Sequence, residues 1–224
     1  EYGRRLAAEL PDAITFSAED ASALDGIDLK LRGRFNVENA LGALFAARAL
    51  GVGEDAIKRG IESVRGVPGR FESVDEGQPF AVIVDYAHKP GALEKVLAAA
   101  RDLTRGRLLV VLGAGGDRDR GKRPVMGRIA SELADVVIFT SDNPRSEDPD
   151  AIIASLVAGA AGDFEVRPDR AAAIARAVEL AQDGDVVVIA GKGAEQGQQF
   201  ADRTIPFDDR DAARDALKAL GART

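Results

Sequence analysis

A chain of 224 residues, 46% of them hydrophobic, is long enough to bury a sizeable core in one or two domains. Its 37 acidic and 30 basic residues leave a net charge of -7, which argues against nucleic acid as a partner. The absence of cysteine and the single histidine, His88, exclude disulfides, thiolate catalysis and metal sites built from cysteine or several histidines. No apolar run approaches the roughly 20 residues that cross a bilayer, and no signal-peptide pattern opens the chain. We therefore expect a cytoplasmic protein without membrane insertion.

The first part of the chain is predicted to be helical. Apolar residues at helical spacing predict one helix over residues 36–50, with Gly51 as its stop, and a second over residues 54–64. A short amphipathic stretch, Arg4–Leu10, precedes them. The segment Gly66–Gly69 then breaks the pattern, as a linker or hinge does. Residues 1–66 are too few and too helical for a complete α/β domain, so we expect them to be the end of a larger one.

Residues 67–224 alternate between apolar runs and helical patterns, which predicts one α/β domain of three layers. Continuous apolar runs are typical of parallel strands buried on both faces. The predicted strands are Phe71–Asp75, Phe80–Tyr86, Leu108–Leu112, Val136–Thr140, Phe164–Val166 and Val186–Ala190. The predicted helices are Gly91–Asp102, Pro124–Leu133, Pro149–Ala160, Arg170–Gln182 and Asp209–Leu220. Residues flanking Gly77 suggest one antiparallel pair at the start of the sheet.

Polar and charged residues follow five of these strands directly. They occupy the turns at residues 85–90, 113–123, 142–145, 169–170 and 191–195. Because the carboxyl ends of parallel strands open on one edge of a sheet, we expect these turns to lie together. Open α/β sheets bind their ligands at that edge. The sequence therefore predicts a binding site there.

The turn Asp142-Asn143-Pro144-Arg145 carries an acid, an amide and a guanidinium. A carboxylate accepts hydrogen bonds from an ammonium group, an amide both donates and accepts, and arginine binds a carboxylate with two parallel hydrogen bonds. Together these groups can hold an amino acid by both of its charged ends. The alternative is an ordinary Asx-Pro turn that caps the following helix.

Three further features each allow two interpretations. The glycine-rich turn at residues 113–123 resembles a phosphate cradle, although it matches neither of the usual nucleotide-loop patterns. Its basic residues Arg118, Arg120, Lys122 and Arg123 either bind a phosphate or carboxylate or are solvated charges before a helix. His88 is either a general base or phosphate contact, or a hydrogen-bonding residue near a helix. Asp85 either contacts a ribose or a magnesium-bound water, or forms an Asx turn. No Ser-His-Asp arrangement is present, so hydrolase chemistry lacks a nucleophile.

Taken in order, the segments GRFNVENALGA, VPGRFE, VDYAHKPGALEKVL, GAGGDRDRGKRPVMG, DNPRSEDP and AGKGAE resemble the Mur ligase family, over nearly the whole chain from Lys30 onward. The resemblance implies a Rossmann-like C-terminal domain, residues 67–224, preceded by the C-terminal part of the central ATPase domain, residues 1–66. It also implies ATP-dependent addition of meso-diaminopimelate to UDP-N-acetylmuramoyl-L-alanyl-D-glutamate through an acyl phosphate, in peptidoglycan synthesis. We expect ATP and Mg²⁺ as cofactors, with the magnesium ligands mostly outside this chain, and a monomer.

The resemblance also implies roles for individual residues. On the ATP side it implies that Asn39 and Arg70 contact the adenine end and Asp85 the ribose, with His88 near the phosphates as the catalytic residue. The DNPR turn implies diaminopimelate as the amino acid. The arginines take its distal carboxylate and the acids take ammonium groups, in a pocket made by Arg118, Asp142, Asn143, Pro144, Arg145, Gly191 and Glu195. No metal ligand is assigned within the chain.

Two departures from the family pattern bear on activity. Ala194 stands where the family usually has histidine. The chain also lacks the N-terminal substrate domain, the glycine-rich phosphate loop and the modified lysine, and the connection at Ile14–Lys30 is short. We therefore expect a fragment that does not turn over ATP by itself, with domain closure hinging near Gly66–Gly69. The alternatives are an L-lysine-adding ligase, against which Arg145 argues, and a non-catalytic module that binds an amino acid or nucleotide.

Overall fold

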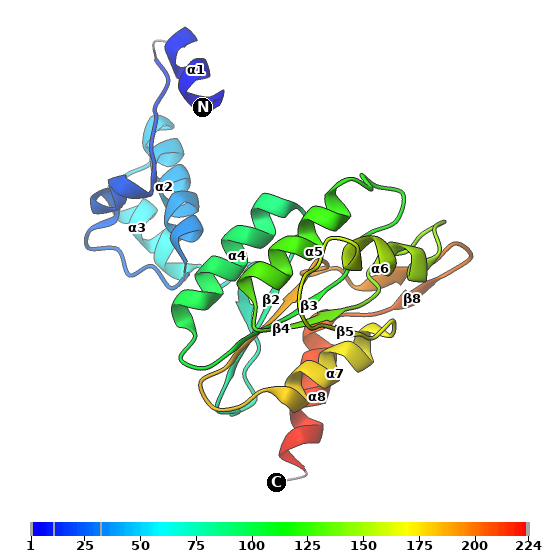
Figure 1. Ribbon diagram of the computed structural model, residues 1–224. Helices are drawn as coiled ribbons and strands as arrows, with labels where there is room; N and C mark the ends of the chain where they lie inside the picture. The colour runs from blue at the N-terminus through cyan, green and yellow to red at the C-terminus, as the bar shows by residue number, and fades with distance from the viewer. Residues whose placement is uncertain (1, 11, 32, 223–224) are drawn as a thin grey trace. The chain divides into compact units, whose positions relative to one another are not determined.

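The computed structural model describes residues 2–10, 12–31 and 33–222. It divides into two compact units, Glu1–Gly66 and Val67–Thr224, each of which is described by itself (Figure 1). The boundary falls at the start of the Gly66–Gly69 segment, for which the sequence predicts a linker.

The first unit is helical. It contains α1 (Tyr2–Glu9), the 3-10 helix η1 (Ala18–Leu24), α2 (Arg34–Ala49) and α3 (Glu54–Ser63). The chain leaves α2 through Gly51, whose φ of 76° is left-handed and suits glycine, so the predicted stop is confirmed. Apolar side chains from η1, α2 and α3 form its core: Leu24, Ala40, Leu41, Leu44 and Ile57.

The second unit is built on a six-stranded sheet in the order β1-β2-β6-β3-β4-β5. In this sheet β1 runs antiparallel to β2, and the other neighbouring strands are parallel. The strands are β1 (Glu72–Ser73), β2 (Ala81–Asp85), β3 (Leu108–Leu112), β4 (Val136–Phe139), β5 (Glu165–Val166) and β6 (Val186–Ala190). The mostly parallel sheet and the antiparallel pair flanking Gly77 are both confirmed.

Helices cover both faces of this sheet and complete the three predicted layers (Figure 1). Alternate strand residues face opposite layers, so that Val110 packs under one set of helices and Val111 under the other. One layer holds α4 (Pro90–Leu103), α5 (Lys122–Leu133) and α6 (Pro149–Val157). The other holds α7 (Arg170–Leu180) and α8 (Asp209–Gly221). Strands buried on both faces explain the continuous apolar runs of the sequence.

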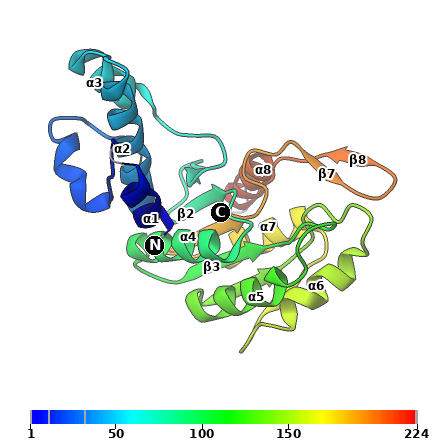
Figure 2. The same ribbon diagram turned by 90° about the horizontal axis from the view of Figure 1, so that it is seen from above.

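One element is absent from the sequence prediction. Strands β7 (Gly197–Gln199) and β8 (Thr204–Pro206) form an antiparallel hairpin that extends from the six-stranded sheet (Figure 2). Neither strand has the alternating or continuous apolar pattern of a buried strand, and β8 is exposed throughout. The hairpin still matters for the site, because the carbonyl of Gln199 accepts the backbone N–H of Arg145 at 2.9 Å.

Two glycines let α5 and α6 approach each other closely. A Cβ atom at Gly127 would lie 1.9 Å from the carbonyl oxygen of Leu156, and one at Gly159 would lie 1.8 Å from that of Pro124. We expect Gly127→Ala to lower the free energy of unfolding by about 1–3 kcal/mol, because the backbones must separate. Denaturant unfolding checks this against Gly91→Ala, whose Cβ meets nothing within 4 Å. Equal stabilities of the two variants would contradict the close approach.

Candidate active site

A cavity of about 720 Å³ opens at the carboxyl ends of the parallel strands. Four of the five predicted polar turns line it, namely those that follow β2, β3, β4 and β6. Its walls are Tyr86, His88, Lys89, Pro90, Gly115, Arg118, Asp119, Gly121, Lys122, Asp142, Asn143, Arg145, Gly191 and Glu195. The turn after β5 does not line it, which corrects the expectation for that turn. There, Asp169 caps α7 by accepting the backbone N–H of Ala172 at 2.8 Å.

The loops after β3 and β4 are fastened to each other. The N–H of Gly116 donates to the carbonyl of Asn143 at 2.8 Å, and that of Asp117 donates to Glu147 at 2.7 Å. The hydroxyl of Ser146 donates to Asp117 at 2.6 Å. A Cβ at Gly116 would lie 1.8 Å from the carbonyl oxygen of Pro144, so glycine serves close loop packing there. The amides of Gly116 and Asp117 bond within the protein and are therefore not available to cradle a phosphate.

The buried side chain of Arg123 joins the same two loops. Its guanidinium is 2% exposed and donates two hydrogen bonds to the carboxylate of Glu147, at 2.8 and 3.0 Å, and a third to the carbonyl of Gly115 at 3.3 Å. Neither interpretation from the sequence, a solvated charge or a ligand contact, fits this residue. Arg120, in contrast, is largely exposed, with an ion pair to Glu147.

The Glu147 carboxylate holds the β3 and β4 loops together while it is ionised. Its hydrogen bonds from Arg123 and the N–H of Asp117 lower its pKa from 4.5 to about 2. Since the folded-state pKa lies below the unfolded one, the stabilisation is fully present above about pH 4.5 and is lost as the pH falls to about 2. We expect Glu147→Gln to remove this part of the pH dependence. Urea unfolding of both proteins between pH 2 and pH 6 measures it, and parallel stability curves would contradict the assignment.

The two arginines predicted to bind a carboxylate both line the cavity. Arg145 is half-buried, with a φ of 53°, and one guanidinium nitrogen donates to the carbonyl of Gly116 at 2.8 Å. Arg118 is exposed and donates to the carbonyl of Asp117 at 2.9 Å. A guanidinium has five N–H donors, so each arginine keeps donors for a ligand carboxylate. The β3 and β4 loops thus carry one arginine each.

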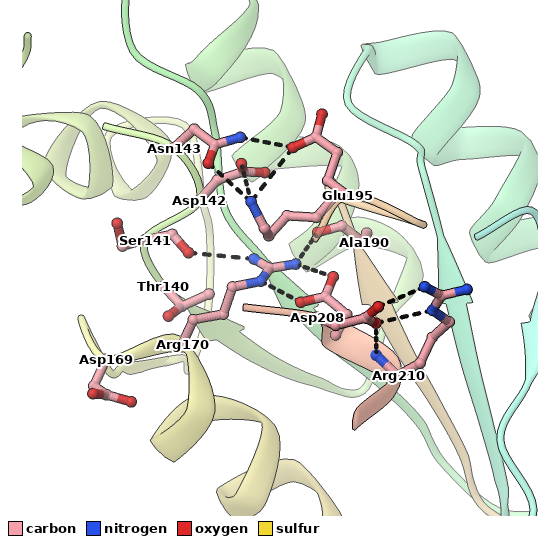
Figure 3. Close-up of polar contacts among 12 residues, drawn as sticks. Thr140, Ser141, Asp142, Asn143, Asp169, Arg170, Ala190, Glu195, Asp208 and Arg210 are labelled. Carbon is pink, nitrogen blue, oxygen red and sulfur yellow. Dashed lines mark hydrogen bonds and ion pairs between the residues drawn. The ribbon is translucent and has the colours of Figure 1, made fainter. Parts of the chain in front are cut away.

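The turns after β4 and β6 meet in a cluster of four residues, Asp142, Asn143, Lys192 and Glu195, which we call the Lys192 cluster (Figure 3). The Asn143 amide donates to Glu195 Oε2 at 2.7 Å, and the fully buried Lys192 ammonium donates to Asn143 Oδ1 at 2.9 Å. Lys192 is not among the predicted site residues, although its place between two glycines after a buried strand is a usable signal.

Gly191 and Pro144 shape the cavity in different ways. A Cβ at Gly191, whose φ is 124°, would lie 2.5 Å from Asp142 Oδ2, so only glycine fits beside that carboxylate. Pro144 is buried and is not one of the cavity-lining residues. Its carbonyl accepts the N–H of Glu147 at 3.1 Å within the β4 loop, and its predicted substrate contact stays a prediction.

The β2 turn supplies the opposite wall. The Tyr86 carbonyl lies 2.9 Å from His88 Nδ1, so Nδ1 carries the proton and Nε2 is left as the nitrogen that can accept one. The His88 carbonyl accepts a hydrogen bond from Lys122 Nζ at 2.8 Å. Burial lowers the pKa of the Lys122 ammonium. Lys89 completes the positive edge of this wall. The structure brings His88 into the cavity, and its catalytic role stays a prediction.

Of the residues predicted for the ATP side, Asp85 and Arg70 lie close to each other in the second unit. Asp85 is buried outside the cavity lining, and its two oxygens accept the N–H groups of Phe71 and Ala87, both at 2.7 Å. Burial raises the pKa of Asp85 despite these bonds. Arg70 lies over the ring of Tyr86, 4.6 Å from its centroid. Asn39 is exposed and belongs to the first unit.

The turn that opens the second unit packs directly under the β6 turn. A Cβ at Gly69 would lie 2.0 Å from the backbone nitrogen of Ala194, and the chain bends there with a φ of 66°. The Gly69 N–H donates to Glu72 at 2.6 Å. Gly69 is therefore fixed within the second unit, which confines the predicted hinge to the residues before it.

A buried ion pair supports the site from beneath (Figure 3). Arg170 and Asp209 are both 0% exposed in their side chains and share two hydrogen bonds of 2.7 Å. Arg170 also donates to the carbonyls of Ser141 and Ala190, which follow β4 and end β6. Burial lowers the pKa of the Arg170 guanidinium, but the charge and hydrogen bonds of Asp209 outweigh it, so the pKa lies above its ordinary value. The sequence predicts Arg170 in a turn that lines the cavity, whereas the structure buries it beneath the turns after β4 and β6.

The fold and the cavity define a Rossmann-like α/β domain with a polar ligand site at the carboxyl ends of its parallel strands. Within the described residues, no helix is both long and apolar enough to span a membrane. Residues 69–193 match the family model for the Mur ligase, glutamate ligase domain. That match covers more than half of the chain, and the chain belongs to the Mur ligase family.

Relatives of known name agree with this assignment. The chain is 47% identical over 251 aligned positions to the UDP-N-acetylmuramoyl-L-alanyl-D-glutamate--2,6-diaminopimelate ligase of Streptomyces coelicolor, with 97% of this chain and 50% of the relative covered. It is 52% identical over 193 positions to the ligase of that name from Halalkalibacterium halodurans, covering 86% and 40%. A solved structure of such a ligase matches with a TM-score of 0.68 and 41% identity over 87% of this chain and 40% of that one. The chain spans half or less of the length of these relatives.

Proposed function

We propose that this chain is the amino-acid-recognising part of a ligase that adds meso-diaminopimelate to UDP-N-acetylmuramoyl-L-alanyl-D-glutamate. The relatives that it resembles carry that name. The single observation that carries the proposal is the composition of the cavity wall. Two arginines, Arg118 and Arg145, face the same space as two carboxylates, Asp142 and Glu195.

This wall suits the distal end of diaminopimelate, which carries an ammonium and a carboxylate on one carbon. Arg145 and Arg118 bind the carboxylate, because a guanidinium matches a carboxylate with paired hydrogen bonds. Asp142 and Glu195 accept the ammonium. The other end of the ligand then presents its amine, which attacks the acyl phosphate of the second substrate and displaces phosphate. L-Lysine lacks the distal carboxylate and leaves Arg145 without a partner.

The opposite wall suits the phosphates of ATP. His88, Lys89 and Lys122 place two ammonium groups and an imidazole at the same cavity. Within the described residues, no group of three or more histidine, aspartate or glutamate side chains could hold a metal ion by itself. In keeping with the proposal, the magnesium ligands lie mostly outside this chain, and no step is assigned to a metal bound by it.

The wider setting follows from the same proposal. The unit Glu1–Gly66 is then the end of the central ATPase domain, and Val67–Thr224 is the C-terminal domain of the ligase. Domain closure hinges before Gly69, excludes water from the acyl phosphate and brings Asn39 and Arg70 to the adenine end of ATP. The protein works in cytoplasmic peptidoglycan synthesis, and so in cell shape and division, as a monomer.

The test is a ligation assay with the full-length protein that carries this chain. Phosphate release and the peptide product are measured with UDP-N-acetylmuramoyl-L-alanyl-D-glutamate, ATP and either meso-diaminopimelate or L-lysine. We expect product with meso-diaminopimelate and little with L-lysine. A preference for L-lysine would overturn the choice of amino acid, and amino-acid binding without ligation would favour a non-catalytic module.

A further inference from the structure

The Lys192 cluster contains one more charged group than an amino-acid site needs. Lys192 is 0% exposed, so its ammonium is out of reach of solvent. It lies 2.9 Å from Asn143 Oδ1, 3.4 Å from Glu195 Oε2 and 3.8 Å from Asp142 Oδ1. Burying an ammonium is costly unless it is paired and hydrogen-bonded, so its presence under the cavity wall calls for a reason.

The backbone turns Lys192 inward and fixes its partners. The flanking glycines, Gly191 and Gly193, have φ values of 124° and 55°, which curl the turn after β6. Asn143 Oδ1 also accepts the backbone N–H of Gln199 at 2.9 Å, and its amide donates to Glu195 Oε2 at 2.7 Å. Both donors to Glu195 thus reach Oε2, and the other oxygen points away from the cluster (Figure 3).

The neighbouring buried cation cannot take the place of Lys192. Arg170 is nearby, but two hydrogen bonds of 2.7 Å pair its guanidinium with Asp209. Its charge is therefore already balanced. Lys192 is the cation that stands directly against Asp142 and Glu195.

Counting charges shows what Lys192 changes. Asp142 and Glu195 alone would offer two negative charges to a ligand, enough for two ammonium groups. With Lys192 the cluster carries a net charge of -1, which matches one ammonium. Coulomb attraction at these separations is strong in a partly buried site, so a difference of one charge is felt by the ligand.

We propose that Lys192 is an internal counter-ion that lowers the negative charge facing the ligand, so that the pocket prefers a zwitterionic amino-acid end over an end that carries an ammonium without a carboxylate. Lys192 is then a specificity-determining positioning residue, since it acts through Asp142 and Glu195 and does not touch the ligand. This inference rests on the proposed function and explains how the acidic half of the pocket contributes to selection, beside Arg145. The disfavoured ligand class is the dibasic amino acid with a net positive charge, such as L-lysine.

The experiment measures the affinity of the full-length protein for meso-diaminopimelate and for L-lysine by titration calorimetry. Lys192→Met keeps most of the side-chain length and removes the charge. We expect it to lower the preference for meso-diaminopimelate over L-lysine by about 30-fold, a typical effect of breaking a buried charge pair. Lys95→Met removes a charge from the exposed face of α4, outside the cavity, and is expected to leave the preference unchanged.

A second pair of variants separates charge from packing and serves even where Lys192→Met alone fails to fold. Glu195→Gln leaves the cluster neutral, so we expect it to bind both amino acids more weakly. Adding Lys192→Met to Glu195→Gln restores a net charge of -1 and is expected to strengthen binding. If Lys192 only filled space, the second substitution would weaken binding in this background too, and that result overturns the inference. A wild-type protein that does not bind meso-diaminopimelate would instead overturn the proposed function.

Discussion

Replacing Arg170 with methionine is expected to lower the free energy of unfolding by about 3–5 kcal/mol, the usual cost of leaving a buried charge unpaired. The substitution leaves the fully buried carboxylate of Asp209 without its arginine partner. It also removes the hydrogen-bond donors to the carbonyls of Ser141 and Ala190. Because those carbonyls belong to the ends of β4 and β6, the loss reaches the floor of the cavity. Chemical denaturation followed by circular dichroism gives the change directly.

Two controls show whether the pairing is responsible. Arg170→Met combined with Asp209→Leu removes both charges and is expected to recover a large part of the lost stability. Arg128→Met breaks an ion pair with Glu132 in which both side chains are more than half exposed, and is expected to change stability by less than about 1 kcal/mol. A double variant as unstable as Arg170→Met would contradict the proposed cost of the unpaired carboxylate.

Replacing Arg145 with alanine is expected to weaken binding of meso-diaminopimelate by about 2–5 kcal/mol. The side chain lines the cavity from a β4 loop held by Arg123, Glu147 and the β7 strand, so other residues cannot readily move into its place. Calorimetry with the full-length protein measures the affinity. L-Lysine provides the matched comparison, since it has no distal carboxylate and should lose little.

Arg145→Lys refines the same prediction. It keeps the charge and loses the planar pair of donors, so we expect an intermediate affinity for meso-diaminopimelate. Unchanged affinity in Arg145→Ala would show that the distal carboxylate binds elsewhere, with Arg118 the next candidate. The backbone at residue 145, with its φ of 53°, is equally strained in all three proteins, which makes the comparison fair.

Most of the fold could be predicted from the sequence because its strands are short apolar runs buried on both faces. The predicted ranges Leu108–Leu112 and Val186–Ala190 match β3 and β6 residue for residue. The edge strands are less well defined, and β1 and β5 are shorter than predicted because each has a neighbour on one side only. The β7–β8 hairpin escaped prediction, since its stability comes from pairing and its contact with Arg145, and not from an apolar pattern.

The sequence predicted which turns form the site better than it predicted what each residue in those turns does. Strand ends showed where polar residues would gather, and Arg118, Asp142, Asn143, Arg145, Gly191 and Glu195 do line the cavity. Sequence alone cannot tell a buried charge from a solvated one when its partner is far along the chain. The ion pairs of Arg123 with Glu147 and of Arg170 with Asp209 form only when the chain folds. For the same reason the sequence does not show that Lys192 is a buried partner of Asn143 and Glu195.

The position of Gly69 has a practical consequence for dissecting this protein. The turn at Val67–Arg70 closes on itself through the N–H of Arg70 and the carbonyl of Val67, and it lies against the β6 turn that carries Lys192 and Glu195. A protease that cuts before Val67 would release a fragment with this support intact. A cut after Arg70 would remove this support from the cavity while leaving every cavity-lining residue in the fragment.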